Sequence, residues 1–229
     1  MSPRVALFID PGCPVAFADE PRRRRLEWLH GIEWDLRACV TREHREDAWT
    51  DGERFARLAA DSGMPIDARD RVWGQATIHA CRAVVAARLR WPDRAGALLR
   101  RLQVLIMAGA LADDSDTLEL AAAQAGLPVA EIAAFCAEPE VEAALRADMA
   151  AAPACPSYDA PSDLPRRPGP ASAVEVLDWA RHPLATAEVA AVCDRTIADV
   201  RAELTRAGAR FEPLAGDGYW SASQERHTG

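Results

Sequence analysis

The sequence has 229 residues, of which 49% are hydrophobic, and a formal net charge of -8. This length suits one large domain or two small ones, and the acidic balance argues against a general binder of nucleic acids or membrane surfaces. No apolar stretch approaches the ~20 residues of a membrane-spanning helix. The opening segment MSPRVALFID reaches an aspartate too soon for a signal peptide.

The cysteines and histidines predict no metal site. The six cysteines are widely scattered, with no CxxC pair and no metal-finger spacing, and the five histidines form no HxH or HExxH pattern. The cysteines are Cys13, Cys39, Cys81, Cys136, Cys155 and Cys193. Scattered cysteines without a pairing pattern favour a reduced, cytoplasmic protein.

The N-terminal third reads as strand, helix, strand. Residues 4–9, RVALFI, alternate as in a buried strand, which the residues Asp-Pro-Gly end at 10–12. A helix is predicted from about Pro14 to His30, with a kink at Pro21. The segment 32–39 follows as a second strand, and a right-handed crossover with parallel pairing is expected.

Helices are predicted one after another from about 51 to 152. Their expected ranges are 51–63, 67–90, 92–111, 115–126, 127–138 and 139–152. One apolar stripe is expected along the helix at 67–90. It comprises Val72, Ala76, His79, Ala83 and Ala86. The proline-rich segment 153–170 then predicts a linker.

The C-terminal part predicts three helices and a hairpin, which together are typical of a small winged helix. Ser172 and Glu175 form a capping box at its start, and the hairpin spans 210–222. At the helix expected at 196–208, two arginines, Arg195 and Arg201, lie among acidic residues. Because contacts to phosphates need a basic surface, the pattern favours a packing or protein-interaction role over DNA binding.

The strongest candidate for chemistry is Cys13, at the junction between the first strand and the first helix. Free amide groups and the helix dipole at this position favour the thiolate, the nucleophilic form. An ordinary thiol has a pKa of about 8.5, whereas thiols at helix starts fall to roughly 3.5–7.5. Arg22 to Arg25 follow closely. They could bind carboxylates of a thiol co-substrate, but four consecutive residues point in all directions, which favours a solvated surface.

The segment FIDPGCPVAFADEP (residues 8–21) resembles the DsbA-like branch of the thioredoxin superfamily, in particular actinobacterial members with a Cys-Pro-x-Ala motif. HACRAVVAARL and PLATAEVAAVC are similar to that branch's helical insertion and C-terminal appendage. The resemblance implies an α/β thioredoxin-like fold with a helical insertion, plus a C-terminal winged-helix-like domain. The expected division is a first domain at 1–160 with the insertion at about 47–152, a linker at 161–170, and the winged-helix-like domain at 171–223.

The resemblance also implies roles for single residues. Cys13 would be the nucleophile, Pro14 would set the helix start, and Ala16 occupies the resolving position. Pro156 is the candidate for the family's cis-proline. Contact with a thiol co-substrate, glutathione or mycothiol, is expected from Cys13, Val15, Phe17 and Pro156.

Position 16 holds alanine and therefore offers no resolving thiol, which affects the reactions that Cys13 can perform. A mixed disulfide at Cys13 has no resolving thiol within the same motif, so a small thiol or another cysteine must release it. This predicts a monothiol oxidoreductase, or an isomerase or transferase dependent on a thiol. The alternative is a non-catalytic interaction protein. Cys155 is either a distant resolving partner or an ordinary strand or linker thiol, and a homodimer is left open.

The sequence leaves the number of strands in the sheet open, because members of the family have two more strands and a helix between the insertion and the appendage. The interval before residue 172 is too short for all of them. Three alternatives follow: the sheet is truncated, the C-terminal hairpin completes it, or the segment around Pro156 is only linker.

Overall fold

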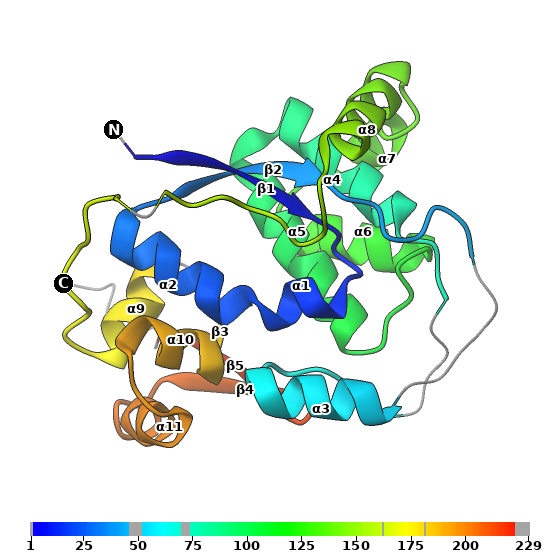
Figure 1. Ribbon diagram of the computed structural model, residues 1–229. Coiled ribbons are helices and arrows are strands. Elements are labelled where there is room, and N and C mark those ends of the chain that lie inside the picture. The colour runs from blue at the N-terminus through cyan, green and yellow to red at the C-terminus, as the bar shows by residue number, and fades with distance from the viewer. Residues whose placement is uncertain (1, 46–51, 70–73, 162, 181, 223–229) are drawn as a thin grey trace.

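The first strand and the second form a small parallel sheet, as predicted. The computed structural model describes all residues except 1, 46–51, 70–73, 162, 181 and 223–229 (Figure 1). Strand β1 (Arg4–Ile9) pairs in parallel with β2 (Glu33–Ala38), Arg4 lying opposite Glu33. Every second residue of β1 is buried, from Val5 to Ile9. The alternation in the sequence therefore identified the inner face of the strand.

The helix after β1 is broken rather than only kinked. Helix α1 (Pro14–Ala18) ends at Asp19, and α2 (Glu20–His30) starts at once. Pro21 lacks the N–H group that would bond to the carbonyl oxygen of Phe17, which accounts for a break at this point. Gly31, with φ +62°, ends α2.

The described residues of the insertion form six helices. They are α3 (Gly52–Ser62), α4 (Ile78–Arg90), α5 (Pro92–Met107), α6 (Ser115–Gln124), α7 (Val129–Phe135) and α8 (Pro139–Ala151). Helices α4 and α8 pack against β2, and α5 packs against α4. Among the described residues, no helix combines the length and the apolar character needed to cross a membrane.

The helix predicted at 67–90 is wrong in its first half, because α4 begins only at Ile78. Residues 74–77 are not helical, and Val72 of the expected stripe lies outside the described residues. Gly74 has a φ of +111°, and the N–H group of Thr77 donates to the carbonyl oxygen of Arg42 at 2.8 Å. These tertiary bonds hold the segment out of the helix despite its helical pattern.

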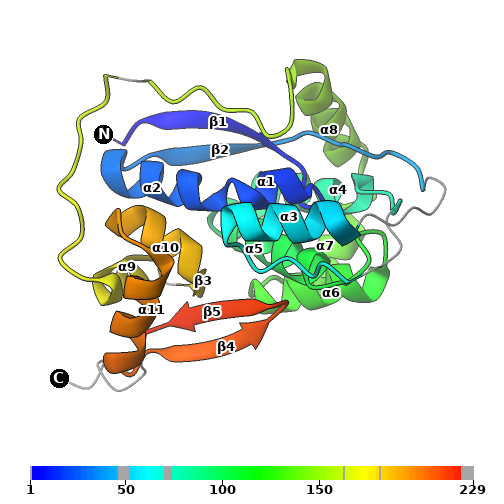
Figure 2. The same ribbon diagram turned by 60° about the horizontal axis from the view of Figure 1, so that its bottom comes forward.

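The parallel sheet stays at two strands in the part of the chain that the structure describes. The segment after α8 runs beside β1 in both views (Figures 1 and 2), and Ser157 forms one antiparallel bridge with Phe8. The C-terminal hairpin belongs to a separate sheet. Of the three alternatives, the structure therefore shows a truncated sheet, with the residues around Pro156 held against its first strand.

The C-terminal part contains α9 (Ala173–Ala180), β3 (Leu184–Ala185), α10 (Thr186–Cys193), α11 (Ile197–Arg206), β4 (Arg210–Leu214) and β5 (Asp217–Ser221). Its three antiparallel strands have the order β3-β5-β4. Helix α10 packs along α2 (Figure 2). Before α9 the chain is also tied to α2: the Arg167 N–H donates to the Leu29 carbonyl at 2.6 Å, and the Trp28 indole donates to the Pro168 carbonyl at 2.9 Å.

Candidate functional site

Cys13 lies at the position that the sequence predicted, as the N-cap residue of α1. The loop before it is shaped by Asp10, whose side chain is completely buried. One Asp10 oxygen accepts the N–H of Gly12 at 2.7 Å, and the Cys13 N–H donates to the Asp10 carbonyl oxygen at 3.1 Å. The other Asp10 oxygen accepts the hydroxyl groups of Thr41 and Thr77 at 2.6 and 2.5 Å.

Gly12 has no room for a side chain. A Cβ atom at this residue would lie 2.6 Å from Cγ2 of Thr77. The loop that presents Cys13 is thus fixed from two sides, by the Asp10 carboxylate and by the close packing of Thr77.

A second thiol lies against Cys13. The peptide bond between Cys155 and Pro156 is cis, the geometry that the resemblance implied. The side chain of Cys155 hydrogen-bonds that of Cys13, and this contact is the largest influence lowering the pKa of Cys13. Burial opposes it, the amides of Ala16 and Val15 lower the pKa further, and the negative charge of Asp10 raises it. The balance favours the thiolate.

The thiol–thiol contact acts in the opposite direction on Cys155. Its pKa is raised, mainly by the hydrogen bond to Cys13 and by burial. Of the two thiols, Cys13 therefore ionises first, and Cys155 keeps its proton and acts as the donor. Two further thiols lie near: Cys39, at the end of β2, has a pKa raised by burial, and that of the fully buried Cys81 is raised well above its ordinary value.

All six cysteines are free thiols. The clustered cysteines do not form a metal site within the described ranges, where no group of three or more Cys, His, Asp or Glu side chains is arranged to hold an ion.

A surface pocket of about 470 Å³ is bounded by residues that follow Cys13 and Cys155 in the chain. It is lined by Val15, Ala18, Asp19, Arg22, Pro156, Ser157 and Tyr158. Val15 is 44% exposed, whereas Cys13 is 8% exposed. A substrate would therefore contact residues on both sides of the cysteine before it reached the sulfur.

The far side of this pocket is made by Tyr158. Its hydroxyl donates to Asp19 at 2.6 Å, and its ring lies edge-on to Trp34 with 5.2 Å between ring centres. The guanidinium of Arg22 lies 5.6 Å from the centre of the Tyr158 ring. Within the described part of the chain, Arg22 has no carboxylate partner, so its charge is available to a ligand.

The structure brings together Cys13, Val15 and Pro156, and it places Pro14 at the start of α1, as expected. Ala16 lies behind the site and is buried. The expected contact of Phe17 with a co-substrate is wrong: this ring has no exposed surface and packs in the core, 5.8 Å from the Arg100 guanidinium. The Phe17 side chain lies on the inward face of α1 and points into the core.

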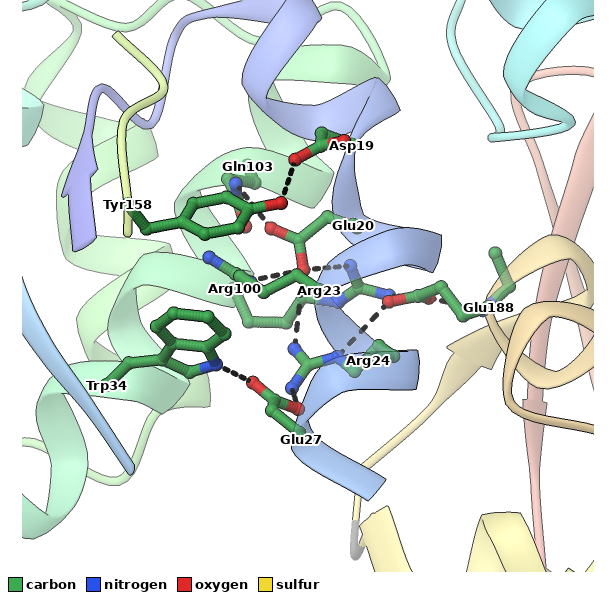
Figure 3. A network of polar contacts seen from close by, with 11 residues as sticks. Asp19, Glu20, Arg23, Arg24, Glu27, Trp34, Arg100, Gln103, Tyr158 and Glu188 are labelled. Atoms are coloured by element: carbon green, nitrogen blue, oxygen red, sulfur yellow. Dashed lines mark hydrogen bonds and ion pairs between the residues drawn. The ribbon is translucent and has the colours of Figure 1, made fainter. Parts of the chain in front are cut away.

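The expectation of a solvated arginine run is also wrong for Arg23 and Arg24. Both are buried and pair with Glu20, and Arg24 also pairs with Glu27 and, at 3.4 Å, with Glu188 of α10 (Figure 3). Arg24 thereby joins α2 to the C-terminal part, whereas Arg23 pairs within α2. The sequence offered no signal for this, because the partner carboxylates include one far along the chain.

Sequence comparisons found no match, either to a protein-family model or to a curated protein. Solved structures do match. One is a probable DsbA oxidoreductase from Streptomyces coelicolor, with a TM-score of 0.55, 23% identity, and coverage of 68% of this chain and 79% of that one. The fold is DsbA-like.

Two other solved structures also match this fold. A putative protein disulfide isomerase from Nitrosomonas europaea has a TM-score of 0.57, 14% identity, and coverage of 72% of this chain and 89% of its own. The cytosolic disulfide reductase DsbM from Pseudomonas aeruginosa, in a structure with GSH, has a TM-score of 0.54, 18% identity and the same coverages.

Proposed function

We propose that this protein is a thiol-disulfide oxidoreductase of the DsbA-like type, with a Cys-Pro-x-Ala motif, and that Cys13 is its nucleophile. The observation that supports it best is the activated sulfur: the Cys13 pKa is lowered next to a surface pocket that is open to a substrate. A second thiol in contact favours disulfide exchange over isomerase or transferase chemistry, which has no need of one.

The reaction starts when the Cys13 thiolate attacks a sulfur of the substrate disulfide. A bond forms between Cys13 and that sulfur, the substrate S–S bond breaks, and the other substrate sulfur leaves as a thiolate. The amides of Val15 and Ala16 and the Cys155 thiol stabilise the sulfur anion before attack. Val15 and Pro156 line the approach.

A small thiol, glutathione or mycothiol, is the proposed co-substrate. Both the reduced cysteines and the fold shared with a cytosolic disulfide reductase solved with GSH support this, and with it a cytoplasmic location. Arg22 offers a guanidinium to a carboxylate of the thiol at the edge of the pocket.

The pH profile of alkylation tests the activated thiol. We expect iodoacetamide to label Cys13 with a midpoint well below that of an ordinary thiol, about 8.5, because its pKa is lowered. Cys136 and Cys193 serve as internal references, since burial raises the pKa of each to about 11. Mass spectrometry of tryptic peptides assigns each label. A Cys13 midpoint at or above 8.5 would instead support a non-catalytic interaction protein.

Replacing Arg22 with alanine is expected to raise the KM for glutathione by about tenfold and to leave kcat unchanged, because the lost contact is a charge-assisted hydrogen bond worth about 1.5–3 kcal/mol. Steady-state kinetics at varied glutathione measures this. Arg206→Ala, at an exposed arginine of α11, is the matched control. An unchanged KM in Arg22→Ala would place the carboxylate elsewhere.

We propose a packing or protein-interaction role for the C-terminal part, as a winged-helix-like unit. Its element order of helix, strand, two helices and a hairpin supports that description. DNA binding is disfavoured because Arg195 pairs with Glu203 and Arg201 pairs with Asp217. Arginines that are already neutralised by carboxylates are poor partners for phosphates.

A further inference from the structure

We infer that Cys155 is the resolving thiol of this site: it attacks the mixed disulfide at Cys13 and closes a Cys13–Cys155 disulfide. The inference rests on the proposed function of Cys13 as the nucleophile. It assigns the resolving role to the residue before Pro156 instead of to position 16, where the motif has alanine.

The backbone holds Cys155 in place from β1. Ser157, two residues later, exchanges both backbone hydrogen bonds with Phe8, at 2.8 and 3.1 Å. Cys155 is half-buried and packs against the core cluster that includes Cys13. The Cys155 thiol lies close enough to Cys13 to lower its pKa as a hydrogen-bond donor. The backbone pairing and the packing thus hold the Cys155 thiol beside Cys13.

The charge on Cys13 explains why Cys13 attacks first and Cys155 second. The Cys13 sulfur and its negative charge are among the main causes of the raised pKa of Cys155. A mixed disulfide at Cys13 removes that charge and weakens the acceptor. Cys155 therefore stays protonated while Cys13 is free, and it becomes easier to ionise once Cys13 has reacted.

The chemistry balances over two steps. Cys13 first takes one substrate sulfur, as described above. Cys155 then loses its proton to the thiolate released in the first step, its sulfur bonds to the Cys13 sulfur, and the substrate sulfur held by Cys13 leaves as a thiolate. The substrate disulfide gains two electrons and the cysteine pair loses two. Two molecules of a small thiol restore the pair and leave as their own disulfide.

The other nearby thiols fit this role less well. Cys81 has no exposed surface and lies on α4. Cys39 interacts mainly with Cys155: the Cys155 side chain is its hydrogen-bond partner. Position 16 is buried as alanine. Among the described cysteines, Cys155 is the one whose side chain hydrogen-bonds that of Cys13.

The test oxidises the full-length protein with glutathione disulfide and maps the products without reduction. In the wild type, Cys39→Ser and Cys193→Ser, we expect a linked pair of peptides containing Cys13 and Cys155. In Cys155→Ser, we expect one glutathione per chain, on Cys13. This adduct is expected to persist about 100-fold longer or more in millimolar glutathione, because an adjacent thiol attacks at a far higher effective concentration.

A second pair of variants separates resolution from activation. Serine keeps a hydroxyl donor at position 155 and alanine does not. The alkylation midpoint of Cys13 is therefore expected to stay near the wild-type value in Cys155→Ser and to move up in Cys155→Ala, while both trap the glutathione adduct.

The outcomes separate the two proposals. If Cys13 forms no adduct in any variant, the proposed function fails. If Cys13 reacts but its adduct decays equally fast in the wild type and in Cys155→Ser, the proposed function stands and the inference is overturned. A disulfide between Cys39 and Cys155, with Cys13 left as the glutathione adduct, would also overturn it.

Discussion

Cys13→Ser is expected to lower the rate of glutathione-dependent disulfide reduction by about 1,000-fold or more, because removing a catalytic nucleophile costs losses of this order. A serine hydroxyl does not ionise near neutral pH, so the amides and the Cys155 thiol would have no anion to stabilise. Serine is similar in size to cysteine, and the backbone hydrogen bonds of residue 13 do not involve its side chain. Reduction of a small disulfide, followed by oxidation of NADPH through a coupled glutathione reductase, measures the rate.

The matched control is Cys193→Ser. Cys193 lies at the end of α10 in the C-terminal part and takes no part in the cysteine cluster. Its activity and unfolding midpoint should match those of the wild type. Activity in Cys13→Ser within tenfold of the wild type, at equal stability, would show that another group performs the attack.

The sequence predicted the parts of this site that are local. The alternation in 4–9 and the residues Asp-Pro-Gly-Cys-Pro were sufficient to place Cys13 at a strand-to-helix junction, because strand period and helix start depend on neighbours in the chain. They also identified Pro14 as the first residue of α1. A resemblance to a known family then pointed to Pro156.

The activation of Cys13 was only partly predictable. Amides at the helix start contribute, as expected, but the larger influence is the thiol of Cys155. That contact depends on the pairing of Ser157 with Phe8, which joins distant parts of the chain. No local pattern in a proline-rich segment distinguishes a linker from a residue held beside a strand. The arrangement therefore became visible only in three dimensions.

Two of the errors have the same cause. Residues 74–77 have a helical pattern, but the Thr77 hydroxyl bonds to the Asp10 carboxylate and its N–H to Arg42. Arg24 belongs to a polar run, but it is buried and pairs with Glu188, far along the chain. In each case a tertiary partner outweighed the local preference, and the partner lies outside any window that a periodicity argument uses.

The buried charges between α2, α5 and α10 converge on Glu188. This side chain has no exposed surface, and it accepts hydrogen bonds from Arg100 and, at 3.4 Å, from Arg24 (Figure 3). It also accepts the N–H of Ala185 at 2.7 Å, at the start of its own helix. Arg100 in turn lies over the ring of Tyr219, 5.3 Å from its centre. Glu188 thus joins the C-terminal part to the helices behind the cysteine site.

Glu188→Ala is expected to reduce the free energy of unfolding by about 3–5 kcal/mol, because it leaves the buried Arg100 guanidinium with only the more distant carboxylate of Glu20, at 3.9 Å. Arg100 is nearly fully buried, and two of its nitrogen atoms have no hydrogen-bond partner among the described residues, so it cannot turn to water. Urea denaturation followed by circular dichroism measures the change. Glu188→Gln keeps an acceptor for the Ala185 N–H and should lose less.

Glu212→Ala provides the control, because Glu212 is an exposed carboxylate on β4 of the same part of the chain. Its effect should stay within about 0.5 kcal/mol. If Glu188→Ala reduced the free energy of unfolding by no more than this, the buried charges would contribute nothing net to the packing of the C-terminal part against α2. The C-terminal part would then be held to α2 by apolar packing alone, since α10 also buries Val189 and Val192. A loss of the expected size, with a single unfolding transition, would mean that the cysteine site and the C-terminal part fold as one cooperative unit.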